Sequence, residues 1–149
     1  MINNEPIFAA LEALLGTLVG YPPSPQYPLA GVSRRMRSFA DVMPAEMPIL
    51  FQIQKKDGAD WKFGRPAKWT LEADLFIYVD TTADKTIIPS QVYNPIVYAI
   101  RSLLVPAGDV TQTLGGLVHR CSMEGEAEYW DGVLDTVAIV CLPIQIIAA

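Results

Sequence analysis

The sequence predicts a single α+β domain over residues 1–149, in which two helices pack on a mostly antiparallel sheet. Two segments carry apolar residues at helical spacing, and several others alternate apolar with polar residues as half-buried strands do. The pair Asp131-Gly132 adds the signal of a tight hairpin turn. In chain order these segments read α-β-β-β-α-β-β, an arrangement typical of the α+β class.

The first helix is expected at residues 5–19. Asn3 or Asn4 can accept hydrogen bonds from its first turn, and Pro6 stands where no backbone donor is needed. Gly20, which precedes a proline-rich stretch, ends the helix. The apolar stripe of this helix comprises Ile7, Phe8, Leu11, Leu14, Leu15 and Leu18.

Residues 21–31 form a proline-rich arm with four prolines and two tyrosines, Tyr21 and Tyr27. Because proline fixes φ and removes a backbone donor, we expect extended, polyproline-like chain here. The arm is either a stiff connector or a stiff segment whose tyrosines dock on a partner at little entropic cost.

A short strand is expected at residues 32–37. It holds the basic cluster of the chain, which consists of Arg34, Arg35 and Arg37. Charges of this kind protect a solvated edge strand against pairing with other chains. They also fit a salt-bridge patch for an acidic neighbouring subunit, and both interpretations stay open.

Two longer strands are expected at residues 48–54 and 67–80. A turn signal at residues 55–58 ends the first strand, and a polar loop containing Trp61 and Phe63 leads to the second. A strand as long as the second spans more than about 40 Å. We therefore expect it to bend or to extend beyond the core.

The second helix is expected to begin at Asn94-Pro95, with the asparagine as its cap and the proline in its first turn. Residues 106–108, Pro-Ala-Gly, end it. Its apolar stripe comprises Ile96, Val97, Ile100, Leu103 and Leu104.

The last part of the chain predicts a hairpin. Its first strand covers residues 117–124 and 127–130, with Gly125 as the position of a bulge, and its second strand covers residues 133–147. From Val137 onward the second strand is apolar on both faces, as in a strand inside a sheet or one covered by a subunit. Pro143 cannot donate to a ladder, so we expect it at a bulge or where pairing stops.

The same register bears on the two cysteines. A two-residue turn at Asp131-Gly132 places Cys121 opposite Leu142, so that Cys121 and Cys141 point to opposite sides of the sheet. We therefore expect two free thiols, although one bulge in the first strand would reverse the geometry.

The composition of the chain argues against several classes of function. The net charge is −5 and only 11 residues are lysine or arginine, which argues against a domain that reads DNA. No apolar run reaches the roughly 20 residues of a membrane-spanning helix, and the first residues lack signal-peptide features, so we expect a cytosolic chain. Two cysteines and one histidine lack metal-ligand spacing, so we expect no metal and no cofactor.

Candidate chemistry is sparse. His119 shares a strand face with Cys121, which would suit a thiol activated by imidazole, but a half-buried structural histidine explains the pair as well. Glu124, Glu126 and Glu128 form either an acid–base set or a solvated acidic rim. Phosphate-binding, dinucleotide and serine-nucleophile motifs are absent from the sequence. We expect no catalytic residue and no enzyme.

The first half of the chain resembles tail terminator proteins of long-tailed bacteriophages. The likeness lies in the spacing from the arginine cluster to Pro48-Ile49-Leu50-Phe51 and then to Lys68-Trp69-Thr70-Leu71. The second half is similar to minor tail and tail-completion proteins of the same group. There the Asn94-Pro95 helix leads to residues 112–119, Gln-Thr-Leu-Gly-Gly-Leu-Val-His, and then to residues 124–126, Glu-Gly-Glu, and an apolar final strand.

The resemblance implies a structural role in the virion. Such proteins form a hexameric ring on the last ring of the tail tube, stop its polymerisation and present a surface to head-completion or neck proteins. The tail tube protein and these neck proteins are then the partners, and DNA passes through the lumen without being read. The chain would be assembled in the host cytoplasm and reside at the neck end of the tail.

A ring needs a heterologous interface, in which one surface meets a different surface of the next copy. The arginine cluster and the glutamate row offer complementary charges for it, and aromatic residues in loops offer apolar anchors. The candidate interface residues are Tyr21, Tyr27, Arg34, Arg35, Arg37, Trp61, Phe63, Glu124, Glu126, Glu128, Tyr129 and Trp130. Two alternatives stay open: another neck or tail-completion component, and a small-molecule-binding or enzymatic α+β domain with a pocket near His119 and Cys121.

Overall fold

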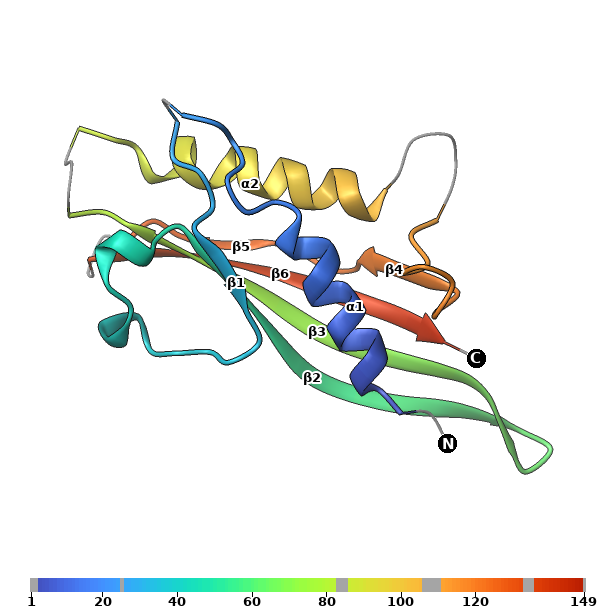
Figure 1. Cartoon of the computed structure of the whole chain (residues 1–149). Coiled ribbons are helices and arrows are strands. Elements are labelled where there is room, and N and C mark those ends of the chain that lie inside the picture. Colours follow the sequence, from blue (N-terminus) through green and yellow to red (C-terminus); the bar gives the residue numbers. More distant parts are fainter. Residues whose placement is uncertain (1–2, 25, 83–85, 106–110, 133–135, 149) are drawn as a thin grey trace.

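A computed structural model describes residues 3–24, 26–82, 86–105, 111–132 and 136–148 (Figure 1). Within these ranges the chain forms two α-helices, six strands and two 3₁₀ turns, in the predicted α+β class and order. The elements are α1 (Glu5–Gly16), β1 (Gly31–Ser33), η1 (Phe39–Asp41), η2 (Pro44–Glu46), β2 (Ile49–Lys62), β3 (Arg65–Asp80), α2 (Pro89–Leu104), β4 (Arg120–Met123), β5 (Glu128–Trp130) and β6 (Val137–Ala148). Neither described helix is long and apolar enough to cross a membrane.

The strands form one sheet in the order β1-β2-β3-β6-β4, and β5 also pairs with β6. β1 runs parallel to β2, and the other pairs are antiparallel. β6 therefore lies inside the sheet, with β3 on one side and β4 and β5 on the other. This position confirms the prediction drawn from its apolar residues on both faces.

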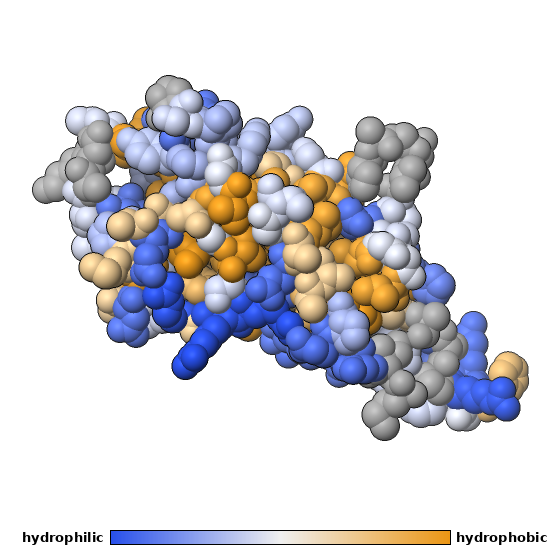
Figure 2. All heavy atoms as spheres, in the orientation of Figure 1, coloured by the Kyte–Doolittle hydropathy of each residue, from blue (hydrophilic) through white to orange (hydrophobic). Residues whose placement is uncertain are grey.

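The β2–β3 hairpin extends well past the rest of the sheet (Figures 1 and 2). The expected turn at residues 55–58 is wrong, because β2 stays paired with β3 as far as Lys62. Where the sequence pattern indicated a turn, the strand instead has a register shift between Gln54 and Lys56 and stays extended. The actual turn is at Phe63 and Gly64, so the expected polar loop is strand.

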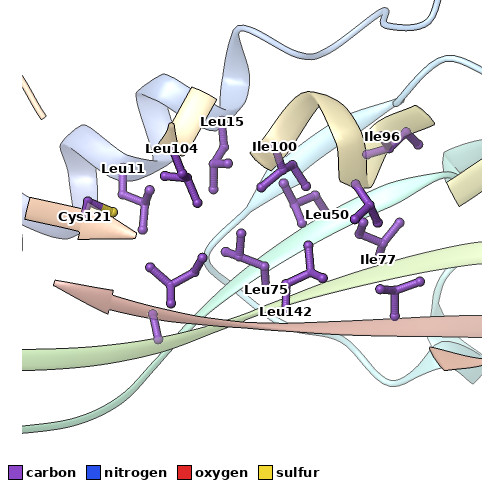
Figure 3. Close-up of a cluster of buried hydrophobic side chains, with 14 of the residues drawn as sticks. Leu11, Leu15, Leu50, Leu75, Ile77, Ile96, Ile100, Leu104, Cys121 and Leu142 are labelled. Atoms are coloured by element: carbon purple, nitrogen blue, oxygen red, sulfur yellow. The ribbon is translucent and has the colours of Figure 1, made fainter. Parts of the chain in front are cut away.

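The first face of the sheet, here called the helix face, carries α1 and α2. Leucine and isoleucine side chains from both helices meet those of β2, β3 and β6 between the layers (Figure 3). The labelled members are Leu11, Leu15, Leu50, Leu75, Ile77, Ile96, Ile100, Leu104 and Leu142, all at most 3% exposed. Burial of each contributes about 1.5–3 kcal/mol, so this layer stabilises the domain.

The second face of the sheet is covered only in part. The segment of residues 34–48, which contains η1 and η2, places Val42 against Phe51 and Tyr78 of this face. The rings of Phe51 and Tyr78 meet edge to face at 5.2 Å, and the Tyr78 hydroxyl donates to the Arg37 carbonyl oxygen at 3.1 Å. This small cluster fixes the segment over one end of the second face.

The helices differ from the predicted boundaries. α1 ends at Gly16 rather than residue 19, and turns continue to Gly20; the Asn3 side chain accepts from the Glu5 amide at its start. α2 begins at Pro89, so Pro95 lies inside it rather than at its start. Two buried residues of the added turns, Val92 and Tyr93, extend the apolar stripe and offset the hydrogen bond that a proline removes. The predicted helix stop at residues 106–108 lies outside the described residues.

The expected short strand at residues 32–37 is β1, which covers only Gly31–Ser33. The proline-rich arm before it doubles back and does not run as one extended segment. Gly20 donates to the Leu29 carbonyl and Leu29 donates to the Tyr21 carbonyl, both at 2.8 Å. Because the Leu29 side chain is buried in the core, the arm is anchored at its base.

The final hairpin has a break in its first strand. In β4, Arg120 pairs with Ile147 of β6, and in β5, Trp130 pairs with Ile139 of β6. The pairing with β6 therefore shifts by two residues between the two strands, around Gly125. Pro143 faces this gap and accepts a hydrogen bond there from the Glu124 amide, as expected for a residue that cannot donate. The expected register, with Cys121 opposite Leu142, is wrong, and residues 133–135 lie outside the described ranges.

The cysteines are free, as predicted. Cys121 pairs with Ile146 rather than Leu142, but its side chain still faces the helices (Figure 3). Cys141 alternates with buried residues of β6 and faces the second side of the sheet. The shift of four residues, from Leu142 to Ile146, preserves this opposition, because a strand changes face with every single residue.

Candidate assembly surfaces

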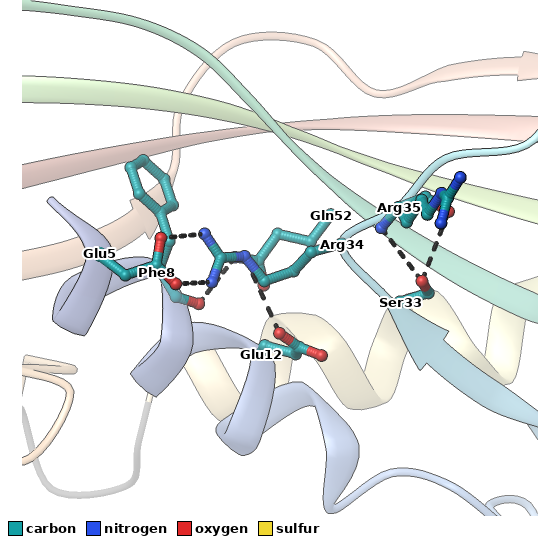
Figure 4. A network of polar contacts seen from close by, with 7 residues as sticks. All are labelled: Glu5, Phe8, Glu12, Ser33, Arg34, Arg35 and Gln52. Atoms are coloured by element: carbon teal, nitrogen blue, oxygen red, sulfur yellow. Dashed lines mark hydrogen bonds and ion pairs between the residues drawn. The ribbon is translucent and has the colours of Figure 1, made fainter.

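The predicted basic cluster is largely paired within the chain. The Arg34 guanidinium donates to the Glu5 carboxylate at 3.0 Å and lies 3.8 Å from that of Glu12 (Figure 4). The hydrogen bond from Arg34 lowers the pKa of Glu5, and the same bond raises the pKa of Arg34. β1 places Arg34 beside α1 for this contact.

Arg37 has a different set of partners. Its guanidinium bonds the Glu46 carboxylate at 3.1 Å and lies 6.0 Å from the centre of the Phe51 ring. The pKa of Glu46 is lowered, first by the hydrogen bond from the Met43 amide and then by Arg37. Of the three arginines, Arg35 is the exposed one, and its side chain has no ion pair within the described residues.

The acidic row lies at the opposite edge of the sheet. Glu124, Glu126 and Glu128 are all exposed, and Glu124 lies 3.5 Å from Arg120. Glu128 starts β5 and pairs in register with Cys141. The glutamates thus form a charged rim beside β6, far in the sheet order from β1 and its arginines.

The β5 aromatics lie on different faces. Tyr129 stacks on Tyr93 of α2, with ring centres 5.3 Å apart. The Tyr93 hydroxyl donates to Asp131 at 2.7 Å, and burial together with this carboxylate raises the pKa of Tyr93 to about 12. Trp130 is 50% exposed and pairs with Ile139, so it flanks the second face of the sheet.

An apolar patch with an acidic rim lies on the second face beside the 34–48 segment's cluster, against which Phe76 and Ile139 pack. Cross-strand pairing aligns Phe76 with Cys141 on adjacent strands, and Ile139 with Trp130. We call this surface the open-face patch; it comprises Phe76, Trp130, Ile139 and Cys141, with Asp74 and Glu128 at its rim. Its members on β3 and β6 are only half-buried.

The charges at this rim affect the thiol between them. Burial, followed by the negative charges of Asp74 and Glu128, raises the pKa of Cys141 to about 11. Asp74 is in turn 3.8 Å from the Lys55 ammonium. Cys141 therefore stays protonated at neutral pH and acts as a small apolar group in the patch.

The projecting end of the β2–β3 hairpin, residues 55–68, is here called the hairpin arm. Trp61 is 65% exposed and Phe63 is fully exposed at its tip. Lys62, Arg65 and Lys68 are also exposed. Figure 2 shows this end of the molecule as mostly hydrophilic, with a hydrophobic residue at the extremity.

The pair suggested for chemistry is not assembled. Cys121 is 0% exposed and burial raises its pKa to about 12, whereas His119 is exposed and its amide donates to the Ile147 carbonyl. A protonated, buried thiol has no access to a substrate. Within the described residues, histidine, cysteine and carboxylate side chains form no group of three that could hold a metal ion.

Two hollows in the described surface are small. One of about 130 Å³ lies between Tyr27, Met47 and Val92, and a more open one of about 270 Å³ lies at the base of the hairpin arm. Sites for small molecules usually measure about 300–1,000 Å³. Neither hollow is lined by His119 or Cys121, although Tyr27 places the proline-rich segment beside the first.

Sequence reasoning named the aromatic tip and Trp130 but missed the open-face patch and the basic residues around the tip. Tyr21 and Tyr27 are exposed as expected, on the proline-rich arm of residues 21–31. The apolar character of β6 on both faces was the available signal for the patch. The comparisons with known proteins add no candidate, because neither a protein-family model nor a curated protein matches this chain.

Proposed function

We propose that this chain is a structural subunit of the tail of a long-tailed bacteriophage. Copies of it form a hexameric ring on the end of the tail tube, end its polymerisation and offer the surface on which head-completion proteins bind. The proposal combines the resemblance of the sequence to tail terminator and tail-completion proteins with the surface described above.

The observation that carries this proposal is the presence of two separate apolar surfaces. The open-face patch lies on the sheet, whereas Trp61 and Phe63 lie at the end of a projecting hairpin. Exposed aromatic groups of this size are typical of protein interfaces. Two unlike surfaces on one chain suit the head-to-tail contacts that close a ring.

The charge distribution agrees with a passage for DNA that is not read. The net charge is −5, and the acidic residues outnumber the basic ones, 16 to 11. Outside the hairpin arm, which gathers the exposed Lys62, Arg65 and Lys68, a lumen lined by such a chain would not hold the phosphate backbone, because tight binding of DNA requires clustered lysine and arginine.

The test uses the purified chain and the tail tube protein of the same phage. Light scattering of the chain should give about 98 kDa, six times 16.4 kDa, either alone or bound to tubes. Electron microscopy should show shorter tubes with a ring at one end when the chain is present. Bare tube ends and an unchanged length distribution would contradict the proposal.

A further inference from the structure

Beyond Ala59 and Trp69, the hairpin arm lacks support from the rest of the described chain. Trp69 of β3 pairs with Ala148 of β6 and with Ala59 of β2, and beyond that row the described sheet consists of β2 and β3 alone. A two-stranded hairpin is marginally stable in water without a covering layer. An arm that also exposes Trp61 and Phe63 therefore calls for a partner surface.

The residue at the tip of the hairpin arm also indicates a partner surface. Phe63 and Gly64 form the turn with φ values of 51° and 75°. Two-residue turns with positive φ at both positions favour Asn-Gly, and a bulky residue is strained there. Since Phe63 is also fully exposed, neither the turn nor burial within the chain explains it. A contact with another molecule does.

Charge restricts that partner. The hairpin arm contains five basic and two acidic residues, so it carries +3 while the rest of the chain carries −8. Lys62, Arg65 and Lys68 have no ion-pair partner within the described residues. The arm is thus an aromatic tip among positive charges, which fits an apolar surface with acidic groups around it.

The chain itself presents such a surface. The open-face patch offers apolar side chains from β3, β5 and β6, and Asp74 and Glu128 stand at its rim. The stretch of residues 124–131 beside it contains four acidic residues and no basic one. We propose that the hairpin arm of one copy docks on the open-face patch of a second copy.

Geometry makes this contact intermolecular. Phe63 and Phe76 lie on the same extended hairpin, separated by 13 residues, which is about 44 Å at strand spacing. An arm that continues straight from its own sheet cannot turn back onto its own patch. The contact is therefore heterologous, and it links copies into a ring or an open chain. That the ring closes rests on the proposed function; the docking of arm on patch does not.

Two variants with reversed charges test the pairing. The arm variant carries Lys62→Glu and Arg65→Glu, and the face variant carries Glu126→Lys and Glu128→Lys. These four side chains have no ion pair within the described residues, so both variants should keep the melting temperature of the native chain. Self-association, measured by analytical ultracentrifugation in low salt with and without tail tubes, should weaken roughly tenfold or more in each.

Mixing the two variants gives the decisive result. The face variant retains a positive arm, which can dock on the acidic patch that the arm variant retains. The negative arm of the arm variant can in turn dock on the positive patch of the face variant. An equimolar mixture should therefore restore assembly, with the two variants alternating around an even-numbered ring. Tyr98→Gln removes an aromatic group that is 69% exposed on α2, outside both surfaces, and should leave assembly unchanged.

The outcomes separate this inference from the proposed function. Native assembly by both variants alone, or a mixture that stays dissociated, would overturn the docking of arm on patch, even if the native chain caps tubes. Loss of assembly in the face variant alone would also overturn it, because the patch would then have another occupant. Complementary mixing without any effect on tubes would support the docking and contradict the tail function. A native chain that never self-associates would overturn both.

Discussion

The two halves of β2 show what separates the body of this protein from its arm. Ile49, Leu50, Phe51 and Gln52 are buried between a helix layer and the 34–48 segment. Past the register shift at Gln54, the same strand is exposed almost throughout, although its pairing with β3 continues. Backbone pairing is common to both halves, so burial, not pairing, accounts for the stability of the first and is missing from the second.

The largest expected effect lies in the body. Leu75 of β3 is fully buried between the sheet and both helices, and Leu75→Ala should lower the free energy of unfolding by about 2–5 kcal/mol because it leaves a cavity. Phe63→Ala, on the same hairpin, should change it by no more than about 0.5 kcal/mol. Urea denaturation of the two variants at low protein concentration measures this contrast. Equal losses would mean that the arm belongs to the cooperative core.

Removal of the outer part of the hairpin arm, residues 60–68, sharpens the comparison. Replacement of residues 60–68 by Asn-Gly joins Ala59 to Trp69, which already pair across the hairpin, through a turn suited to that span. The melting temperature should stay close to that of the native chain, since residues 60–65 and Lys68 are all exposed. Self-association should disappear in light scattering. A shortened chain that assembles normally would show that the arm is dispensable.

A substitution at the tip should act on stability and assembly in opposite directions. Phe63→Asn puts the residue that tolerates positive φ into the turn, so the unfolding free energy should rise by up to about 1 kcal/mol. The same change removes the aromatic anchor and should weaken self-association. Denaturation and ultracentrifugation of one sample measure both. Stronger assembly together with higher stability would indicate that the arm acts only through its backbone.

The sequence was sufficient for the body and insufficient for the arm, for one reason. Apolar periodicity reports burial, and it identified both helices, the body of each long strand and the interior position of β6. Strand residues that are exposed on both faces show no apolar periodicity in the sequence. Lys55, Lys56, Asp57 and Gly58 therefore had the composition of a turn, and only pairing with β3 keeps them extended.

The candidate surfaces were predictable to a similar extent. Exposed aromatics at Trp61, Phe63 and Trp130 could be inferred from their place in predicted loops or near a hairpin tip. The open-face patch could not, because it is assembled from three strands, and the register of β5 on β6 follows an irregular break at Gly125. Nor could the pairing of Arg34 with Glu5, residues 29 positions apart, be read from local sequence.

The smallest expected effect concerns that ion pair, and it distinguishes a charge used inside the chain from one left for a partner. Arg34 holds the pKa of Glu5 below its ordinary value of 4.5, so the pair stabilises the fold above that pH and its contribution is lost as the pH falls through the folded pKa. Arg34→Met should melt slightly below the native chain at neutral pH in low salt. The gap should narrow at about pH 3 and in about 1 M salt.

Arg35→Met is the matched control, because Arg35 is exposed and its side chain has no ion pair within the described residues. It should show no melting deficit that depends on pH. An equal, pH-dependent deficit in both variants would mean that the effect follows net charge and not the contact with Glu5. If Arg35→Met instead weakens self-association at unchanged melting temperature, then of the three clustered arginines it is Arg35 that meets a neighbouring subunit.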